Sequence, residues 1–268
     1  MADLLALSRA EQERSKRLLR RRLYFHLGTL ALGVVAVAID SPWIAITSVL
    51  ALVTEGGAWW IKASAQNAHE AAEAGRRRAL LIRELGNDPD RLNTATLTAD
   101  FSPWAREHAS DWDDPTYYAT SGPVGAARLC EAQREASFWS GSLYRAAGVE
   151  RAVWLTVIAA GIIVLALLVL VVDSGTAGTL AARAATVALA TLVAVDEFSI
   201  CTSFFTAARV SERTAQALTS VSPHDLGQVL SAFSDYAVAT ALAAPIPTRI
   251  YKRRHDQLEA AWAAQATG

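Results

Sequence analysis

Four long apolar stretches occur in two closely spaced pairs, and this arrangement restricts the fold of the chain more than any other feature. A helix needs about 20 apolar residues to cross the ~30 Å hydrocarbon core of a bilayer, and each stretch approaches this length. The stretches cover residues 24–39, 43–61, 152–172 and 179–195. We therefore predict an all-α integral membrane protein whose four transmembrane helices form two hairpins.

The remaining segments are polar and complete the predicted domain organisation. The predicted parts are a basic amphipathic helix (1–23), a first transmembrane hairpin (24–62), a cytoplasmic helical insert (63–151), a second hairpin (152–208) and a cytoplasmic helical tail (209–268).

Local signals refine the polar segments. Gly86 is expected to end a helix over residues 64–85, because glycine is favoured just after a helix C-terminus. Residues 87–123 contain four prolines and many Asp and Asn residues, which predicts irregular structure held in place by its aromatic side chains. In the tail, residues 244–247 (Ala-Pro-Ile-Pro) predict a non-helical connector between two helices.

Positive charges are distributed unevenly around the apolar stretches. In the predicted topology, Arg183 is the single residue among the 25 Lys and Arg that does not lie on one common side. The positive-inside rule then places both termini and the middle segment in the cytoplasm. Arg183 itself is expected to snorkel to the outer headgroups, with pairing to Asp40 or Asp173 as the alternative.

The sequence contains no signature of an enzyme or a metal site. There is no phosphate-cradling glycine loop, no His and Glu pair at zinc spacing and no nucleophile-elbow pattern. Cys130 and Cys201 are expected to be reduced thiols, and the five histidines are scattered singly. We therefore expect no catalytic residue, no metal and no cofactor. We also expect no direct binding of nucleic acid, because the basic N-terminal cluster suits a topology anchor at the membrane surface.

Acidic and hydroxyl residues near the inner ends of two stretches are candidates for the lining of a pore. A carboxylate at the depth of Glu55 usually faces a partner or water. Asp196 and Glu197 lie at the inner end of the fourth stretch, and hydroxyl residues continue that segment. The alternative is a helix that simply emerges into the cytoplasm. The pore-lining candidates are Glu55, Asp196, Glu197, Ser199 and Ser203.

A basic run in the insert is a candidate for sensing an anionic ligand. Arginine forks match phosphate oxygens, so the run could receive a nucleotide. The alternative is that these side chains solvate the helix or touch lipid. The ligand-sensing candidates are Arg76, Arg77, Arg78 and Arg83.

Two short motifs and the overall layout point to a family. One motif is the run Leu129–Glu135, followed by Phe138-Trp139 and Leu143–Arg145, which leads into the third apolar stretch. The other is Ala244–Pro247 followed by Ile250–Lys252. With the order of helix, hairpin, insert, hairpin and tail, they resemble the SMODS-associated four-transmembrane effectors, pore formers of bacterial antiphage defence.

The resemblance covers the whole layout but departs from the family pattern in two places. Glu131-Ala132 is inserted within the first motif, and Thr248-Arg249 stands where an acid and an aromatic residue are expected. The resemblance implies a homo-oligomeric pore in the bacterial inner (plasma) membrane. A cyclic nucleotide from a partner nucleotidyltransferase would open the pore and cause abortive infection.

Two other functions remain open at the level of sequence. The first is a non-conducting membrane scaffold or sensor that recruits partners through its cytoplasmic helices. The second is a membrane enzyme acting on lipid, for which His26 and Glu55 are the pair that could be nominated as acid and base.

Overall fold

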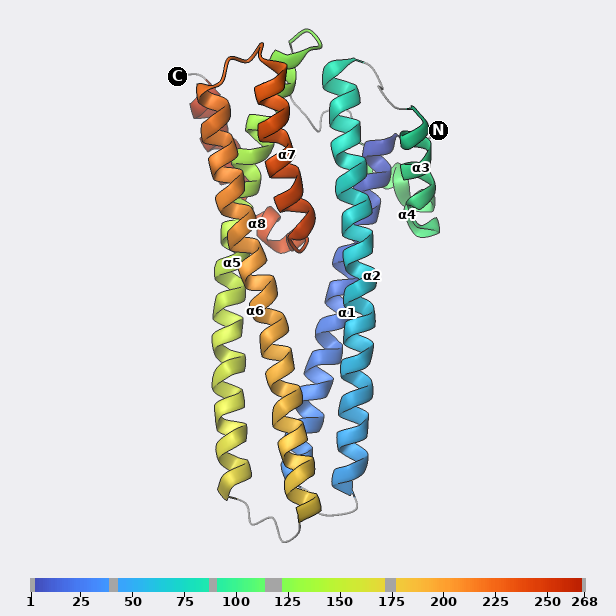
Figure 1. The fold of residues 1–268 in the computed structure, drawn as a ribbon, viewed down its shortest axis with the longest axis vertical. Coiled ribbons are helices and arrows are strands. Elements are labelled where there is room, and N and C mark those ends of the chain that lie inside the picture. The colour runs from blue at the N-terminus through green and yellow to red at the C-terminus, as the bar shows by residue number, and fades with distance from the viewer. Residues whose placement is uncertain (1–2, 39–42, 87–90, 114–121, 172–176, 267–268) are drawn as a thin grey trace. The chain divides into compact units, whose positions relative to one another are not determined.

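The computed structural model confirms the predicted all-α class, because every element of the described chain is a helix (Figure 1). The structure describes residues 3–38, 43–86, 91–113, 122–171 and 177–266. Contacts between residues divide the chain into two compact units, and each unit is described by itself below.

The first unit, called the apolar unit, comprises Arg17–Ala65 and Val149–Cys201. Parts of four helices run side by side in it (Figure 1). Their bounds are Leu4–Ala38 for α1, Trp43–Leu85 for α2, Ala126–Val171 for α5 and Ala177–Ser220 for α6.

Three helices of the described chain, α2, α5 and α6, are long and apolar enough to cross a membrane. The predicted first span, on α1, is not among them. Its described apolar part, residues 23–38, measures about 24 Å at ~1.5 Å per residue, and Arg20–Arg22 precede it directly. Residues 39–42 and 172–176, which include most of the two predicted outer turns, lie outside the described residues.

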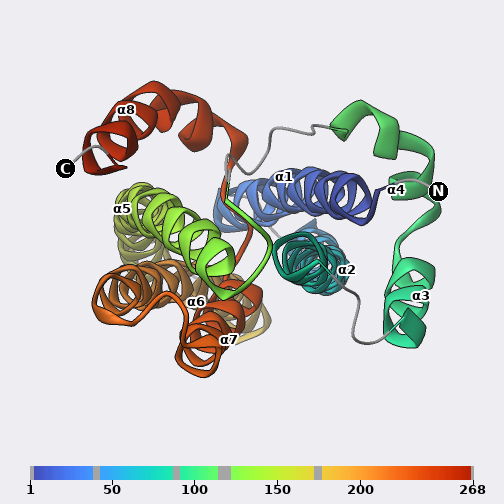
Figure 2. The same cartoon turned by 90° about the horizontal axis from the view of Figure 1, so that it is seen from above.

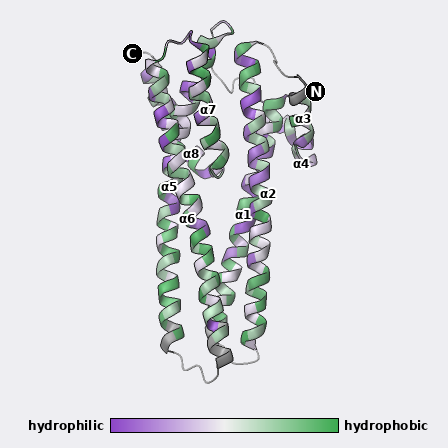
Figure 3. Cartoon of the chain, in the orientation of Figure 1, coloured by the Kyte–Doolittle hydropathy of each residue, from purple (hydrophilic) through white to green (hydrophobic). Residues whose placement is uncertain are grey.

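The apolar unit carries many of its large aliphatic side chains outside and a group of polar side chains inside. The parts of α2, α5 and α6 that belong to this unit consist mostly of apolar residues (Figure 3). For example, Val53 is 65 % exposed and Val153 is 62 % exposed, whereas small residues such as Ala51 and Ala58 are buried. We name the buried polar side chains of this unit the polar seam: Arg22, His26, Thr29, Glu55, Arg183, Thr186 and Glu197.

The burial of Arg183 corrects the prediction that this residue snorkels outward. Its side chain lies inside the unit, with 3 % exposure. It shares a face of α6 with Thr186, Ala190, Val193 and Glu197, all of them buried, because spacings of three and four residues repeat on one side of a helix. Asp40 and Asp173, its predicted alternative partners, lie outside the described residues.

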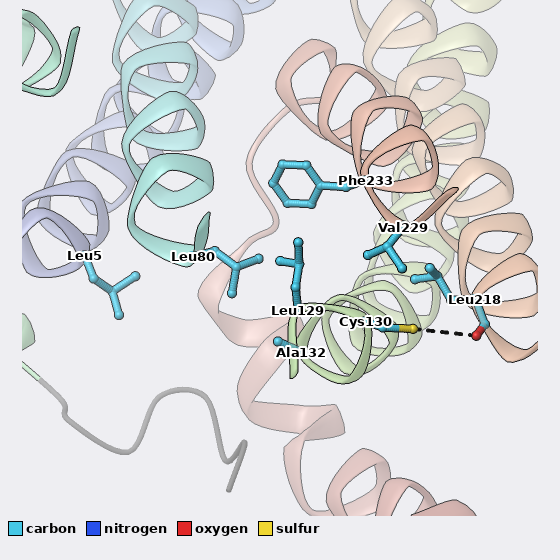
Figure 4. Close-up of a cluster of buried hydrophobic side chains, with 8 residues drawn as sticks. All are labelled: Leu5, Leu80, Leu129, Cys130, Ala132, Leu218, Val229 and Phe233. Atoms are coloured by element: carbon cyan, nitrogen blue, oxygen red, sulfur yellow. Dashed lines mark hydrogen bonds between the residues drawn. The ribbon is translucent and has the colours of Figure 1, made fainter. Parts of the chain in front are cut away.

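The second unit, called the polar unit, comprises Met1–Lys16, Gln66–Gly148 and Thr202–Gly268. Its hydrophobic core joins four helices: Leu5 comes from α1, Leu80 from α2, Leu129 from α5 and Leu218 from α6 (Figure 4). Val229 and Phe233 add a fifth helix, α7 (Leu226–Leu242), to the same core.

The two tail helices pack on different sides of the polar unit (Figure 2). The first, α7, contacts α2 through Tyr236, whose hydroxyl lies 3.3 Å from Nη2 of Arg76. The second, α8 (Thr248–Ala266), lies on α5, where the rings of Phe138 and Trp262 are 5.5 Å apart. Residues 243–247 between them are non-helical, which confirms the predicted connector.

The segment predicted to be irregular is largely helical where it is described. It forms α3 (Arg91–Asp100), α4 (Pro103–His108) and the 3-10 helix η1 (Ala109–Trp112). Pro103 starts a helix, because the first helical position tolerates proline, and Ser102 caps the helix by accepting a hydrogen bond from the amide of Ala105. The predicted packing of this segment is confirmed: Phe101 is buried in a cluster with Leu7 and Ala10.

The C-terminus of α2 is also confirmed. The helix runs from Trp43 to Leu85, and Gly86 follows with φ of +77°, a left-handed conformation that favours glycine. Likewise, α5 continues without a break from the predicted insert into the third apolar stretch.

Candidate functional site: a buried ionic cluster

The first helix places three polar side chains on its buried face. Arg22, His26 and Thr29 are spaced by four and three residues, so they lie above one another on the inner side of α1. Leu23, Tyr24 and Leu27 between them point outward and are exposed. The sequence therefore folds locally as an amphipathic helix whose polar face is the buried one.

His26 lies between carboxylates from two other helices. Its Nδ1 donates a hydrogen bond to Oε2 of Glu55 on α2, at 3.1 Å, and its Nε2 lies 3.7 Å from Oδ2 of Asp196 on α6. The other oxygen of Glu55 accepts a hydrogen bond from Nε1 of Trp59, at 3.0 Å. Both His26 and Glu55 are 3 % exposed, so the contact is dry.

Three cations surround these groups. Arg22 pairs with Asp196, and its Nη2 lies 3.6 Å from Oε1 of Glu197. Lys62 also pairs with Asp196, and Arg151 of α5 donates from Nη1 to Oε2 of Glu197, at 2.7 Å. We name the whole group the ionic cluster: Arg22, His26, Glu55, Lys62, Arg151, Asp196 and Glu197.

The ionic cluster is balanced in charge. Its three strong bases match its three carboxylates when His26 is neutral, and a buried charge is tolerated when it is paired. The side chain of Arg22 is 2 % exposed and that of Glu197 is 6 % exposed, so pairing accounts for their burial. The cluster can hold four helices in register, and it can accept or release a proton at His26.

Neither a protein-family model nor a curated protein nor a solved structure matches this chain. Its function is therefore proposed from the chemistry of its own residues, together with the family resemblance described above.

The structure brings three of the five predicted pore-lining residues together. Glu55, Asp196 and Glu197 all belong to the ionic cluster, where their carboxylates contact cations or His26. Ser199 is exposed on α6 and is not a member of the cluster. Ser203 belongs to the polar unit and is half-buried.

The four predicted ligand-sensing arginines do not form one patch. Arg76 binds Glu73 at 2.7 Å, Arg77 donates to the carbonyl of Glu73 and Arg78 donates to Thr94 of α3, at 2.9 Å. These adjacent residues point in different directions, since each step along a helix turns by about 100°.

Arg83 lines a cavity of about 290 Å³ in the polar unit. The other lining residues are Asp3, Leu4, Leu5, Ala79, Ile82 and Thr94. The cavity is at the small end of ligand pockets, and Arg83 and Thr94 can supply it with a cation and a hydroxyl.

A second buried polar network lies in the polar unit. His69 on α2 has no exposed surface, and its Nε2 donates to the carbonyl of Thr240 on α7, at 3.0 Å. Burial lowers the pKa of His69 below its ordinary value, because a second proton would lie at the buried Nδ1. Burial acts to raise the pKa of Glu73, but Arg76, His69 and Arg77 together outweigh it, so the pKa of Glu73 is lowered.

A group that could hold a metal ion lies on the surface of α8. Ligand atoms of His255, Asp256 and Glu259 lie within 4.8 Å of one another. The two carboxylates are well exposed, and the ring of His255 contacts Trp139 at a tilt and Tyr251 edge-to-face. Exposed groups of this kind are ordinary on helix surfaces, so we assign no metal site here.

Sequence reasoning missed Arg22, Lys62 and Arg151 as members of the site, because they read as flanking charges of the apolar stretches. One signal was available for two members: Arg22, His26 and Thr29 recur at the period of a helix at the start of an apolar stretch. The pair of His26 and Glu55, nominated from sequence as a possible acid and base, is in contact in the structure.

Proposed function

We propose that the protein is a multi-pass membrane effector that permeabilises the bacterial inner membrane. The observation that supports this proposal is the polar seam inside a unit whose outer surface is aliphatic. In water the opposite arrangement is favoured, whereas in a bilayer an aliphatic surface faces the lipid and interior polar groups mark a path for ions.

In this proposal α1, α2, α5 and α6 supply four spans, with both termini and the polar unit in the cytoplasm. The short apolar part of α1 is accommodated by the exposed Arg20 and Arg21 before it, which reach the headgroups. Protomers assemble into a homo-oligomer. A cyclic nucleotide from a partner nucleotidyltransferase binds the polar unit and switches the membrane part to its conducting state, which causes abortive infection.

The cavity at Arg83 is the place in the polar unit that we propose for recognition of a phosphate group. Arg83 and Thr94 provide hydrogen-bond donors there. Four apolar side chains and the carboxylate of Asp3 complete the wall, so a phosphate must lie on the Arg83 side of the cavity. A whole cyclic nucleotide is larger than this cavity, so the proposal places one part of the ligand in it.

The alternative as a lipid-directed enzyme is less favoured. His26 and Glu55 are in contact, but both side chains are buried, and a headgroup could not reach them without opening the apolar unit. The non-conducting scaffold remains the alternative that the experiment below separates from the effector.

Ion release from liposomes containing the purified full-length protein tests the proposal. The movement of protons and of trapped potassium across the vesicle membrane is measured without ligand and with cyclic dinucleotides and cyclic trinucleotides of adenine and guanine. We expect release that depends on one nucleotide. We also expect Arg83→Ala to need a higher concentration of that nucleotide for the same release. Liposomes that stay sealed under every condition would refute the effector and favour the scaffold.

A further inference from the structure

The ionic cluster is poorly suited to passing a metal cation. Each of its carboxylates already contacts a base: Glu55 contacts His26, Asp196 contacts Lys62 and Glu197 contacts Arg151. A metal cation entering the cluster would lose its hydration shell without gaining an unpaired carboxylate. A proton needs neither a hydration shell nor an unpaired carboxylate, because it can move along hydrogen bonds between side chains.

His26 has the geometry of a group that passes a proton between two others. Its two ring nitrogens face carboxylates on opposite sides, Glu55 at 3.1 Å and Asp196 at 3.7 Å. Imidazole can gain a proton at one nitrogen and lose one at the other, which a single-atom base cannot do. Nε2 is buried and makes no hydrogen bond with the described residues, so it is open to a proton.

The polar seam continues from Glu55 towards the Trp43 end of α2. The hydroxyl oxygens of Thr29 and Thr54 lie 2.9 Å apart, directly after Glu55 in the seam. Ser48 follows about 9 Å further along α2, and its buried hydroxyl has no hydrogen-bond partner among the described residues. On α6, Thr186 and Arg183 are buried in the seam on the Ala177 side of the cluster.

We propose that the ion conducted by this protein is the proton, and that His26 relays it between Asp196 and Glu55 through the polar seam of each protomer. This inference rests on the proposed function, because it names the ion that the effector releases. It places the conducting path inside the four helices of a protomer, whereas a shared pore would lie between protomers.

The relay step is balanced. Protonated Asp196 gives its proton to Nε2 of His26, and the imidazole releases its Nδ1 proton to the carboxylate of Glu55. Asp196 becomes a carboxylate, Glu55 becomes a carboxylic acid and His26 stays neutral as its other tautomer. Moving back to the starting tautomer, by turning the ring or by exchanging protons with water, resets the relay.

The charges around His26 set the conditions for this transfer. Arg22 and Lys62 both contact Asp196, so the relay requires the activated state to exchange one of these contacts for a proton while Glu197 stays paired with Arg151. The groups that face His26 or its two carboxylates are Arg22 from α1, Glu55 and Lys62 from α2, Arg151 from α5, and Asp196 and Glu197 from α6.

Proton flux into liposomes tests the inference. The vesicles hold a pH-sensitive dye and are exposed to a pH step with the membrane voltage clamped, while potassium release is followed in parallel. The cyclic nucleotides named above are the probes for activation. We compare the natural protein with His26→Gln and Glu55→Gln, which keep hydrogen-bonding groups, and with His224→Gln at an exposed position of the polar unit.

We expect activated proton flux without potassium release, a drop of about 100-fold in both seam variants, and natural flux in His224→Gln. Gel filtration and near-UV circular dichroism verify that each variant is folded. Proton flux that persists in both folded seam variants would overturn the relay. Potassium release that accompanies proton flux would also overturn it but would leave the effector standing, whereas sealed liposomes would refute both proposals.

Discussion

Nη1 of Arg151 on α5 donates a hydrogen bond to Oε2 of Glu197 on α6, at 2.7 Å, inside the apolar unit. Glu197 is 5 % exposed, and its other oxygen lies 3.6 Å from Arg22 of α1. One carboxylate thus joins three helices that are far apart in the sequence. The pair is the most direct test of whether the ionic cluster holds the unit together.

Replacing Arg151 by Ala is expected to destabilise the folded protein by roughly 2 kcal/mol, because Glu197 would remain buried with one weaker partner. Denaturant titration in detergent micelles measures this change. The matched control is Arg145→Ala, which breaks the exposed pair with Glu212 and should change stability far less, because water screens that pair. Equal effects of the two substitutions would show that burial adds nothing to the Arg151 pair.

Gly33 is expected to be intolerant of a side chain. A Cβ at this position would lie 2.8 Å from Cγ2 of Thr186, whereas a Cβ at Gly28 on the same helix meets nothing within 4 Å. We expect Gly33→Ala to destabilise the protein by about 1 to 3 kcal/mol through overpacking. Gly28→Ala should be neutral or stabilising by up to about 1 kcal/mol, because alanine favours the helix.

A second substitution verifies the cause of the Gly33 effect. Thr186→Ser removes the methyl group that a Cβ at position 33 would strike. The combination of Gly33→Ala with Thr186→Ser should therefore be more stable than Gly33→Ala alone, as judged by thermal unfolding in micelles. If the stability lost in the double variant equals the sum of the losses in the two single variants, the strain does not arise from the contact between positions 33 and 186.

Acid is expected to destabilise the polar unit through His69. Burial lowers the pKa of His69 in the native protein. Below the unfolded-state pKa of about 6.5, His69 therefore binds a proton in the unfolded chain but stays neutral in the native unit. Stability is therefore fully present above pH 6.5 and falls as the pH drops towards the native pKa, by up to about 1.4 kcal/mol per pH unit. Amide hydrogen exchange of α7 between pH 7.5 and 5 measures this loss.

The variant His69→Gln isolates that contribution. It should show a flatter pH profile than the natural protein between pH 6.5 and 5. Glu73 acts lower: its native pKa is lowered, so its contribution is present above about pH 4.5 and is lost as the pH falls through the native value. Identical slopes for both proteins in the upper range would argue against the role of His69.

Tyr236→Phe is expected to cost about 1 to 2 kcal/mol, because the buried hydroxyl contacts two groups. It lies 2.7 Å from Oγ of Ser140 and accepts from Arg76 at 3.3 Å. Tyr24→Phe is the control, since that side chain is 66 % exposed. Differential denaturant unfolding measures both variants, and a neutral Tyr236→Phe would mean that the hydroxyl contacts add no net stability.

Much of the local structure could be predicted from the sequence. The helix that ends at Leu85, the connector at residues 243–247 and the continuity of α5 all follow from periodicity and from glycine and proline signals. Within residues 87–123, the prediction of irregular structure was wrong for the described helices between Arg91 and Trp112, because the prolines suggested loops. Pro103 instead occupies the first turn of a helix, the one helical position where a missing amide is harmless.

The candidate site was only partly predictable. Glu55, Asp196 and Glu197 were identifiable because carboxylates are rare within apolar stretches. Their partners were not: Arg22 and Lys62 resemble ordinary charges at the ends of apolar stretches. The buried position of Arg183 was likewise hidden, because the sequence does not say which side of α6 faces the other helices.

The sequence by itself determined the helical class and the apolar length of α2, α5 and α6, because periodicity and composition are local properties of the chain. The tertiary structure alone decided that His26 meets Glu55, 29 residues away, and that Arg22 meets Asp196. Such contacts depend on the rotation and register of separate helices. The rotation and register of each helix are set by the packing of all four helices together. In that packing the aliphatic faces turn outward and small residues let the helices approach closely.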